Sequence, residues 1–534
     1  DIPRAPMRRT VLAALAALLA AASALQAQPK PGLGPSRPGL LSLRGGASLK
    51  EETSLKGAPP FVKACASFSA MDSLLLGYDI GCISGILLFV QEEFALTSHQ
   101  VEVFASAMNS AALAGALFSG YIADRFGRKP ALFMSSCTFA LGSILMAVAT
   151  SYDMLVYSRY IQGFGVGAGL LISPMFISEV APKQWRGALV TLSEVALSLG
   201  ILLAYIVNYL LSGVDSQWRW MIGLGAAPDV LLALRMLFLP ESPRFLVGKG
   251  KVERARKVQR RILHRPGQPE KITHAEADAE LAEIIKGTEE DKEGRWVELF
   301  EPATLCAVCV GMVVACLQHA VGIESIIYYS TKIFQQAGVS SKSKAILLTV
   351  SMGLIKLVCE TYSLLNVDRI GRRPLLMVGS LGLTASLLAI GGSMQVKLAA
   401  ATPGVTAASI GVFAGIVGYM AFHALSYGPI TWLVLAEIFP SNIRGKAMGI
   451  ATMVNRGTSF VVAYTFLTMC ERLEWSGTFY LYAAMAAASF VFYGLFVPET
   501  AGVRLEEIPP LFGDPKALVR RNLGALRAMV PRSK

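Results

Sequence analysis

The chain has 534 residues, of which 53% are hydrophobic and only 16% are charged. Soluble domains carry about 25% charged residues, so this composition argues against a soluble globular protein. The net charge of +12 raises nucleic-acid binding as a possibility, but Lys and Arg concentrate in alternate loops and acidic residues occupy the loops between. This is the positive-inside pattern of membrane proteins, so we predict a lipid bilayer as partner and no nucleic acid.

Apolar segments of membrane-spanning length recur along the chain. A run of about 20 apolar residues can cross a bilayer, and backbone in lipid must satisfy its own hydrogen bonds, so such runs are predicted to be helices. The predicted spans are residues 63–90, 102–123, 131–150, 154–177, 187–211, 219–239, 303–330, 344–366, 374–394, 408–436, 445–469 and 477–497.

Short motifs between the spans occur twice. The loop Asp-Arg-Phe-Gly-Arg-Lys-Pro at 124–130 returns as Asp-Arg-Ile-Gly-Arg-Arg-Pro at 368–374, and a Pro-Glu pair ends both the sixth and the twelfth span. Such duplication predicts an all-α membrane protein whose twelve transmembrane helices form two pseudo-symmetric six-helix halves. The predicted domains are a leader at 1–60, an N-terminal half at 61–239, a helical linker on the cytoplasm-equivalent side at 240–302, a C-terminal half at 303–500 and a tail at 501–534.

The leader is unlike the rest of the chain. Met7-Arg8-Arg9 and an Ala/Leu-rich run are typical of a signal peptide, and residues 29–60 are basic and rich in Pro, Ser and Gly, as in a transit peptide. Two interpretations remain open. Either the leader is a two-step address that ends at a plastid envelope, or it is an uncleaved leader on a plasma-membrane protein.

These motifs carry a family resemblance over residues 63–512. The two halves with their basic loops resemble the major facilitator superfamily. Within it, Pro240–Arg244, Gly428–Trp432 and Pro498–Thr500 resemble the sugar porters. Leu76–Gly81, together with Glu194, Lys356 and the pair Asn455-Arg456, is most similar to plant-type polyol and monosaccharide proton symporters. The resemblance implies alternating access around a site near the midplane, and it implies a transporter of a small neutral sugar or polyol.

Charged residues at the helix ends beside the basic loops predict a gate. Arginines of the loops and matched glutamates would pair when this side of the bundle is shut, although orientation by positive charge alone would explain the arginines without the acids. Exposed pairs are individually weak, so a network suits reversible gating. The predicted gate residues are Asp124, Arg125, Arg128, Glu179, Arg186, Glu241, Arg244, Asp368, Arg369, Arg372, Glu437, Arg444 and Glu499.

Two charges lie deep within predicted spans. Asp79 is in the first span and Arg159 in the fourth, where a charge costs about 2.5–3.5 kcal/mol on insertion scales and so needs a partner or a task. In the sugar porters, an Asp at this position binds the transported proton and the Arg tunes it. We therefore predict proton coupling through Asp79 and Arg159, with a permanent structural ion pair as the alternative.

The predicted substrate site departs from the usual amides of sugar porters. Amides donate to and accept from sugar hydroxyls without net charge, whereas His319, Glu324 and Lys356 replace three of them here. Gly322 is expected to break the helix so that Gln318 and Glu324 both face inward, and Gly428-Pro429 to break the helix before Trp432. The predicted substrate residues are Glu194, Gln318, His319, Glu324, Tyr328, Lys356, Trp432 and Asn455.

Two interpretations of this charge set stay open. Glu324 and Lys356 would neutralise each other around a neutral polyol, or Lys356, Arg456 and His319 would favour a sugar acid. A non-transporting sugar sensor is a further alternative. The chain carries no nucleophile–base constellation, so we predict that it is no enzyme. Cys306 and Cys309 lie on an apolar helix and are read as packing, so no metal or cofactor is predicted, and the functional unit is expected to be monomeric.

Overall fold

The computed structural model describes residues 59–181, 186–264, 270–290, 296–400, 404–440, 442–503 and 507–529. Within these ranges the chain is helical and contains no strand. The predicted leader lies outside the described residues apart from its last two positions.

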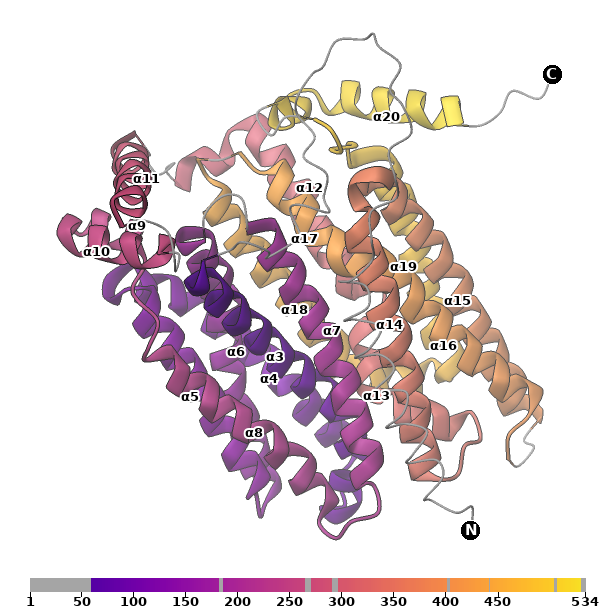
Figure 1. Ribbon diagram of the computed structural model, residues 1–534. Helices are drawn as coiled ribbons and strands as arrows, with labels where there is room; N and C mark the ends of the chain where they lie inside the picture. The colour runs from indigo at the N-terminus through magenta and orange to yellow at the C-terminus, as the bar shows by residue number, and fades with distance from the viewer. Residues whose placement is uncertain are drawn as a thin grey trace, which may run out of the picture. The chain divides into compact units, whose positions relative to one another are not determined.

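The long helices fall into two sets of six spans, as predicted (Figure 1). The first set is α3 (Pro60–Glu93), α4 (Ser98–Phe126), α5 (Arg128–Ala147), α6 (Tyr152–Val180), α7 (Arg186–Leu211) and α8 (Gln217–Met236). The second set is α12 (Pro302–Ala320) with α13 (Ile323–Gln336), α14 (Lys342–Ile370), α15 (Arg372–Ala400), α16 (Ala407–Leu425) with α17 (Tyr427–Ile438), α18 (Arg444–Arg472) and α19 (Glu474–Phe496).

Within the described residues, ten spans are long and apolar enough to cross a membrane by composition alone. The other two members of the bundle are α8 and α18, which carry more polar and charged side chains. Asp229 lies inside α8, and Asn455 and Arg456 lie inside α18. Because intramembrane charge is costly, these two helices are the first places to look for function.

Two spans are broken. The seventh is interrupted at Gly322, whose φ of +92° suits glycine and where a Cβ would lie 2.5 Å from the Tyr482 ring. The break expected there is therefore confirmed, and it turns the first residues of α13 toward α18. The tenth span is interrupted at Ser426. The break before Trp432 is also present, but Gly428 and Pro429 lie within the first turn of α17, where proline is tolerated.

Each basic loop is a tight glycine turn between two helices. Gly127 and Gly371 have φ of +112° and +94°. The carboxylate of Glu241 accepts the backbone N–H of Arg128 at 3.0 Å, and Glu499 accepts that of Arg372 at 3.0 Å. Each acid thus caps the N-terminus of α5 or α15, where free N–H groups and the helix dipole favour an anion. A Cβ on either glycine would collide with that carboxylate.

The two sets of helices pack together through α4 against α18 and α7 against α14. One buried apolar cluster contains residues of both sets. Large apolar side chains such as Leu117, Leu231 and Val378 are exposed on the outer faces of the helices. The exposed fraction is 57% for Leu117, 60% for Val378 and 54% for its neighbour Leu381. Exposed apolar side chains on a bundle of this length suit contact with lipid.

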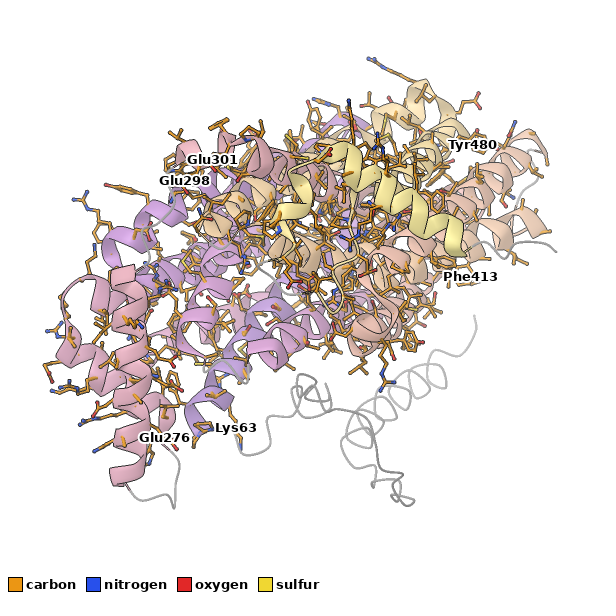
Figure 2. The ribbon with its side chains drawn as sticks, turned by 90° about the horizontal axis from the view of Figure 1, so that it is seen from above. Lys63, Glu276, Glu298, Glu301, Phe413 and Tyr480 are labelled. Carbon is orange, nitrogen blue, oxygen red and sulfur yellow. The ribbon has the colours of Figure 1, made fainter. Side chains whose placement is uncertain are left out.

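Short helices connect the two sets. They are α9 (Pro243–Gly248), α10 (Val252–Leu263), α11 (Glu270–Glu290) and the 3-10 helix η2 (Trp296–Phe300). Ile262 of α10 and Ala277 of α11 join a buried cluster with α3, α5, α6 and α8, so these helices pack on the first set. Figure 2 shows Glu276 on α11, and Glu298 and Glu301 just before α12. After α19 follow η4 (Pro509–Phe512) and α20 (Pro515–Met529).

Candidate functional site

The intramembrane ion pair predicted from the sequence is present. Arg159 Nη1 lies 3.0 and 2.7 Å from the two carboxylate oxygens of Asp79. The side chains of Arg159 and Asp79 are 0% and 8% exposed. Gln162, one turn after Arg159, donates to Asp79 Oδ1 at 2.8 Å and accepts from Arg159 Nη1 at 2.9 Å. Nε and Nη2 of Arg159 are buried without a partner. Asp79 is therefore held by two donors, while the arginine keeps unused capacity.

A polar network joins the broken seventh span to α18. Asn455 Nδ2 donates to Gln318 Oε1 at 2.6 Å, and Gln318 Nε2 donates to the carbonyl oxygens of Tyr427 and Gly428 at the break in the tenth span. His319 Nε2 lies 3.1 Å from Asn455 Oδ1. These amide hydrogen bonds therefore connect the two interrupted spans and α18, close to the breaks at Gly322 and Ser426.

Glu324 pairs with His319 across the break at Gly322. Its Oε1 lies 3.2 Å from His319 Nδ1 and accepts from Ser459 Oγ at 2.7 Å. Arg456 Nη2 lies 3.1 Å from His319 Nε2 and donates to Asn455 Oδ1 at 2.6 Å. Gln318 and Glu324 thus belong to one connected network, as the expected break would allow.

Lys356 pairs with Glu360 and not with Glu324, the partner considered from the sequence. Its Nζ lies 2.6 Å from Glu360 Oε2 on the same helix and donates to Ser198 Oγ of α7 at 3.0 Å. Ser198 also donates to Glu360. The proposed mutual neutralisation of Glu324 and Lys356 is therefore wrong in this structure. An acid one turn away on the same helix satisfies the lysine, and histidine satisfies Glu324.

The remaining predicted substrate residues are more scattered. Tyr328 is buried, and its hydroxyl accepts from Asn109 of α4 at 3.4 Å. Trp432 is partly buried beside the main apolar cluster. Glu194 lines a cavity inside the first set of helices, and it interacts electrostatically with Lys356 and Glu360. The prediction placed Glu194 with the amides, whereas the structure places it beside the Lys356 cluster.

The two sets of helices meet tightly at the ends opposite the basic loops. Thr468 of α18 donates its backbone N–H and its hydroxyl to the buried Glu102 of α4, both at 2.7 Å. Lys342 pairs with Glu92, and Ser212 lies 3.1 Å from Ser343. These contacts hold that side of the bundle closed.

At the basic loops, the ion pairs of the two central arginines each join residues of one half. Arg128 contacts Glu179 at 3.0 Å and Asp124 at 3.2 Å. Arg372 contacts Glu437 at 2.9 Å and Asp368 at 2.6 Å. The matched arrangement in the two halves explains why the sequence repeats here.

The other predicted gate residues differ in their contacts. Glu241 and Glu499 bind backbone N–H groups rather than the arginine side chains expected of a gate. Arg125 donates to the Tyr121 hydroxyl at 2.7 Å, and Arg444 donates to the Phe439 carbonyl. Arg369 is exposed and Arg244 lies at the start of α9. The side chain of Arg186 lies outside the described part.

Sequence reasoning missed several polar residues of these networks. Gln162 and Glu360 each stand one turn from a residue that was found, at the spacing that places two side chains on one helix face. His423 lies 3.3 Å from the Gln318 carbonyl and between Tyr419 and Tyr427. Asp229 is a buried carboxyl in α8. All four are polar residues within apolar runs, and that signal alone would have singled them out.

Comparison with known sequences agrees with this arrangement. Residues 65–512 match the family model described as "Sugar (and other) transporter". The protein named Probable polyol transporter 4 of Arabidopsis thaliana is 34% identical, over 86% of this chain and 89% of its own length. Probable metabolite transport protein CsbC of Bacillus subtilis is 37% identical, over 83% and 92%.

Solved structures show the same fold. The inward-open xylose transporter XylE from E. coli superimposes with a TM-score of 0.70 at 26% identity, covering 84% of this chain and 99% of that one. The MFS proton:xylose symporter XylE bound to 6-bromo-6-deoxy-D-glucose gives a TM-score of 0.69 at 27% identity, covering 85% and 99%. The chain therefore belongs to the sugar (and other) transporter family of the major facilitator superfamily.

Proposed function

We propose that this protein is a secondary active transporter that carries a monosaccharide or polyol together with a proton by alternating access. The observation that carries this proposal is the buried Asp79–Arg159 pair with Gln162. A carboxylate that contacts a cation is held ionised, and separation from that cation favours its protonation. One side chain can therefore bind and release a proton as the helices around it move.

The kinship adds to this argument. The relatives named above include a probable polyol transporter and a proton:xylose symporter. The contacts opposite the basic loops hold the two halves together on that side. A state open toward the basic loops is one of the two end states that alternating access requires, and the other requires those contacts to break.

The charge balance between the two halves favours a neutral substrate. Lys356 is neutralised by Glu360, and Glu324 contacts His319, which in turn contacts Arg456. Buried charges that are paired in this way leave amides and hydroxyls to recognise sugar hydroxyl groups. The second candidate substrate is a sugar acid. Its support is that two basic side chains, Arg456 and His319, lie near a single acid, Glu324. Uptake competition separates the two, since sugar acids rather than polyols would compete under the second.

The proton role is tested in proteoliposomes with an imposed pH gradient and labelled polyols and hexoses. We expect concentrative uptake that a proton uncoupler abolishes. Asp79→Asn should lose accumulation but keep exchange of labelled for unlabelled substrate, because exchange needs no net proton movement. Asp215→Asn, which removes an exposed carboxylate, is the matched control and should behave as wild type. Concentrative uptake by Asp79→Asn would overturn the proton role.

Three further parts of the proposal concern the setting of the transporter. The segment 240–302 is the linker on the cytoplasm-equivalent side, with boundaries as predicted. One chain is the functional unit, because the Asp79 pair and the Gln318 network both lie within it. The membrane is that of a plastid envelope or the cell surface. Fusing residues 7–60 to a fluorescent protein distinguishes these, since a plasma-membrane or diffuse signal would exclude the plastid.

A further inference from the structure

A cavity of about 170 Å³ lies within the N-terminal set of helices, and the proposed function does not use it. Carboxyl and hydroxyl groups from α3, α6, α7 and α8 line it, including Ser69, Asp72, Ser173, Ser193, Glu194 and Asp229. Apolar side chains such as Leu76, Phe139 and Leu232 make up much of the remaining lining. A cavity of this size has room for several water molecules beside its polar groups. Helix α3 starts on the basic-loop side and reaches Asp72 two turns before Asp79, so the cavity lies between that side and the ion pair.

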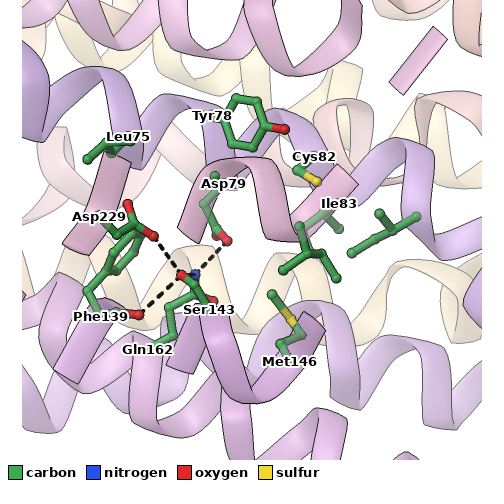
Figure 3. A pocket seen from close by; sticks show the side chains of 13 residues that line it. Leu75, Tyr78, Asp79, Cys82, Ile83, Phe139, Ser143, Met146, Gln162 and Asp229 are labelled. Carbon is green, nitrogen blue, oxygen red and sulfur yellow. Dashed lines mark hydrogen bonds between the residues drawn. The ribbon is translucent and has the colours of Figure 1, made fainter. Parts of the chain in front are cut away.

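Asp229 stands at the inner end of this cavity. Asp229 is only 3% exposed, and its Oδ2 accepts a hydrogen bond from Ser143 Oγ at 2.8 Å. Its Oδ1 is buried and has no hydrogen-bond partner. Asp229 also lines a second pocket, of about 10 Å³, together with Asp79 (Figure 3). That pocket holds at most about one water molecule, so side chains must make the connection to Asp79.

The connection consists of two residues. Gln162 Nε2 donates to Asp79 Oδ1 at 2.8 Å and to Ser143 Oγ at 3.1 Å. The Ser143 hydroxyl can donate either to Asp229 or to the Phe139 carbonyl, which lies 3.1 Å away (Figure 3). With Asp229 ionised, Ser143 donates to it. With Asp229 protonated, the carboxyl donates to Ser143 and Ser143 turns to Phe139. The surroundings thus accept both protonation states without a change of packing.

We propose that Asp229 is a second proton site, which exchanges its proton with the basic-loop side through the cavity at Asp72 and sets how readily Asp79 releases its own. This inference rests on the proposed proton symport. An unpaired buried carboxylate is costly, and two nearby carboxylates disfavour being ionised together. The amide of Gln162 carries no proton between them, because it donates in both directions and acts by position and charge.

The titratable and charged groups near Asp229 lie on the helices that surround the two pockets. From α3 come Asp72, Tyr78 and Asp79. From α6 comes Arg159, which is paired with Asp79. From α7 comes Glu194, across the cavity. Helix α5 contributes the neutral Ser143 and Phe139. Since Arg159 already has a carboxylate, the charge on Asp229 acts on the acidic groups near it, Asp79 and Asp72.

The first test measures proton-driven uptake against pH in proteoliposomes. Asp229→Asn removes a negative charge near Asp79, so release of the Asp79 proton becomes easier and the midpoint of the pH profile moves to lower pH by about one unit. Asp229→Glu keeps the charge and should restore the wild-type profile, and Asp215→Asn should leave it unchanged. An unshifted midpoint in Asp229→Asn would overturn the inference.

The second test does not depend on transport. Infrared difference spectra of the purified protein, recorded on changing pH, should contain a protonated-carboxyl band that persists in Asp79→Asn and disappears in Asp229→Asn. Ser143→Ala keeps both carboxyls and should move the titration of this band by about half a pH unit or more. If Asp229→Asn loses no protonated-carboxyl band relative to wild type, the second site is refuted. If wild-type uptake moves no protons, the symport proposal itself fails, which is a separate outcome.

Discussion

The contact between Glu102 and Thr468 joins the two halves on the side opposite the basic loops, and breaking it should shift the balance between the two end states. Glu102 is 0% exposed and accepts two hydrogen bonds from one residue of the other half. Lys332 of α13 adds electrostatic attraction to the same carboxylate. Glu102→Gln keeps the shape of the side chain but removes its charge and one acceptor.

The magnitude follows from the kind of bond. Hydrogen bonds to a charged group contribute about 1.5–3 kcal/mol and neutral ones about 0.5–1.5 kcal/mol. Weakening two such bonds therefore costs the closed arrangement on this side about 2 kcal/mol. Since 1.4 kcal/mol corresponds to a tenfold change, the ratio of the two conformations should change by about 30-fold in favour of the state that is open here.

Pulsed EPR distances between spin labels would measure this change. Labels at the exposed positions Val214 and Lys344, in a background without the native cysteines, report the separation of the halves on this side. Glu93→Gln is the matched control, because Glu93 binds Trp218 and Arg219 of its own half. A distance distribution of Glu102→Gln equal to that of wild type would refute the reasoning, as would an equal shift in Glu93→Gln.

Two further predictions concern stability in detergent. Gly371→Ala forces alanine into a left-handed conformation and against the Glu499 carboxylate, so it should cost about 1–3 kcal/mol of stability and lower Tm. Gly248 has open space around it, so Gly248→Ala should leave Tm unchanged. Equal Tm values for the two variants would contradict this. Lys356→Met leaves Glu360 buried without its cation, a loss of about 3–5 kcal/mol. Adding Glu360→Gln to it should recover most of that loss, and a single variant as stable as wild type would show that the pair is not buried in solution.

Much of the fold could be predicted because it depends on local pattern. Ten of the described spans are apolar enough to be predicted from composition alone, and the break at Gly322 follows from a glycine within the seventh span. The ion pair of Asp79 with Arg159 was predictable for another reason. Two opposite charges in separate apolar helices have few other partners, so their pairing is nearly forced once the helices pack.

The partners of the substrate residues were harder to predict. Lys356 could have been assigned to Glu360 from their four-residue spacing, but its contact with Ser198 depends on how α7 and α14 pack. The break at Gly322 was expected, but the contact of Glu324 with His319 depends on how the two parts of the helix reorient around it, which the sequence does not specify. The role of Glu241 and Glu499 as caps was missed because acids and arginines near one another suggest ion pairs, and backbone N–H groups leave no trace in a sequence.

Those caps tie together positions 113 residues apart in the first half and 127 apart in the second. In each half, the chain from the third helix to just past the sixth is thereby closed by one carboxylate, and this stretch is fourteen residues longer in the second half. The added length lies in the chain between the tied points and leaves the tie itself unchanged. Loop length in such a half is therefore free to vary, while the third and sixth helices must travel together whenever the half turns.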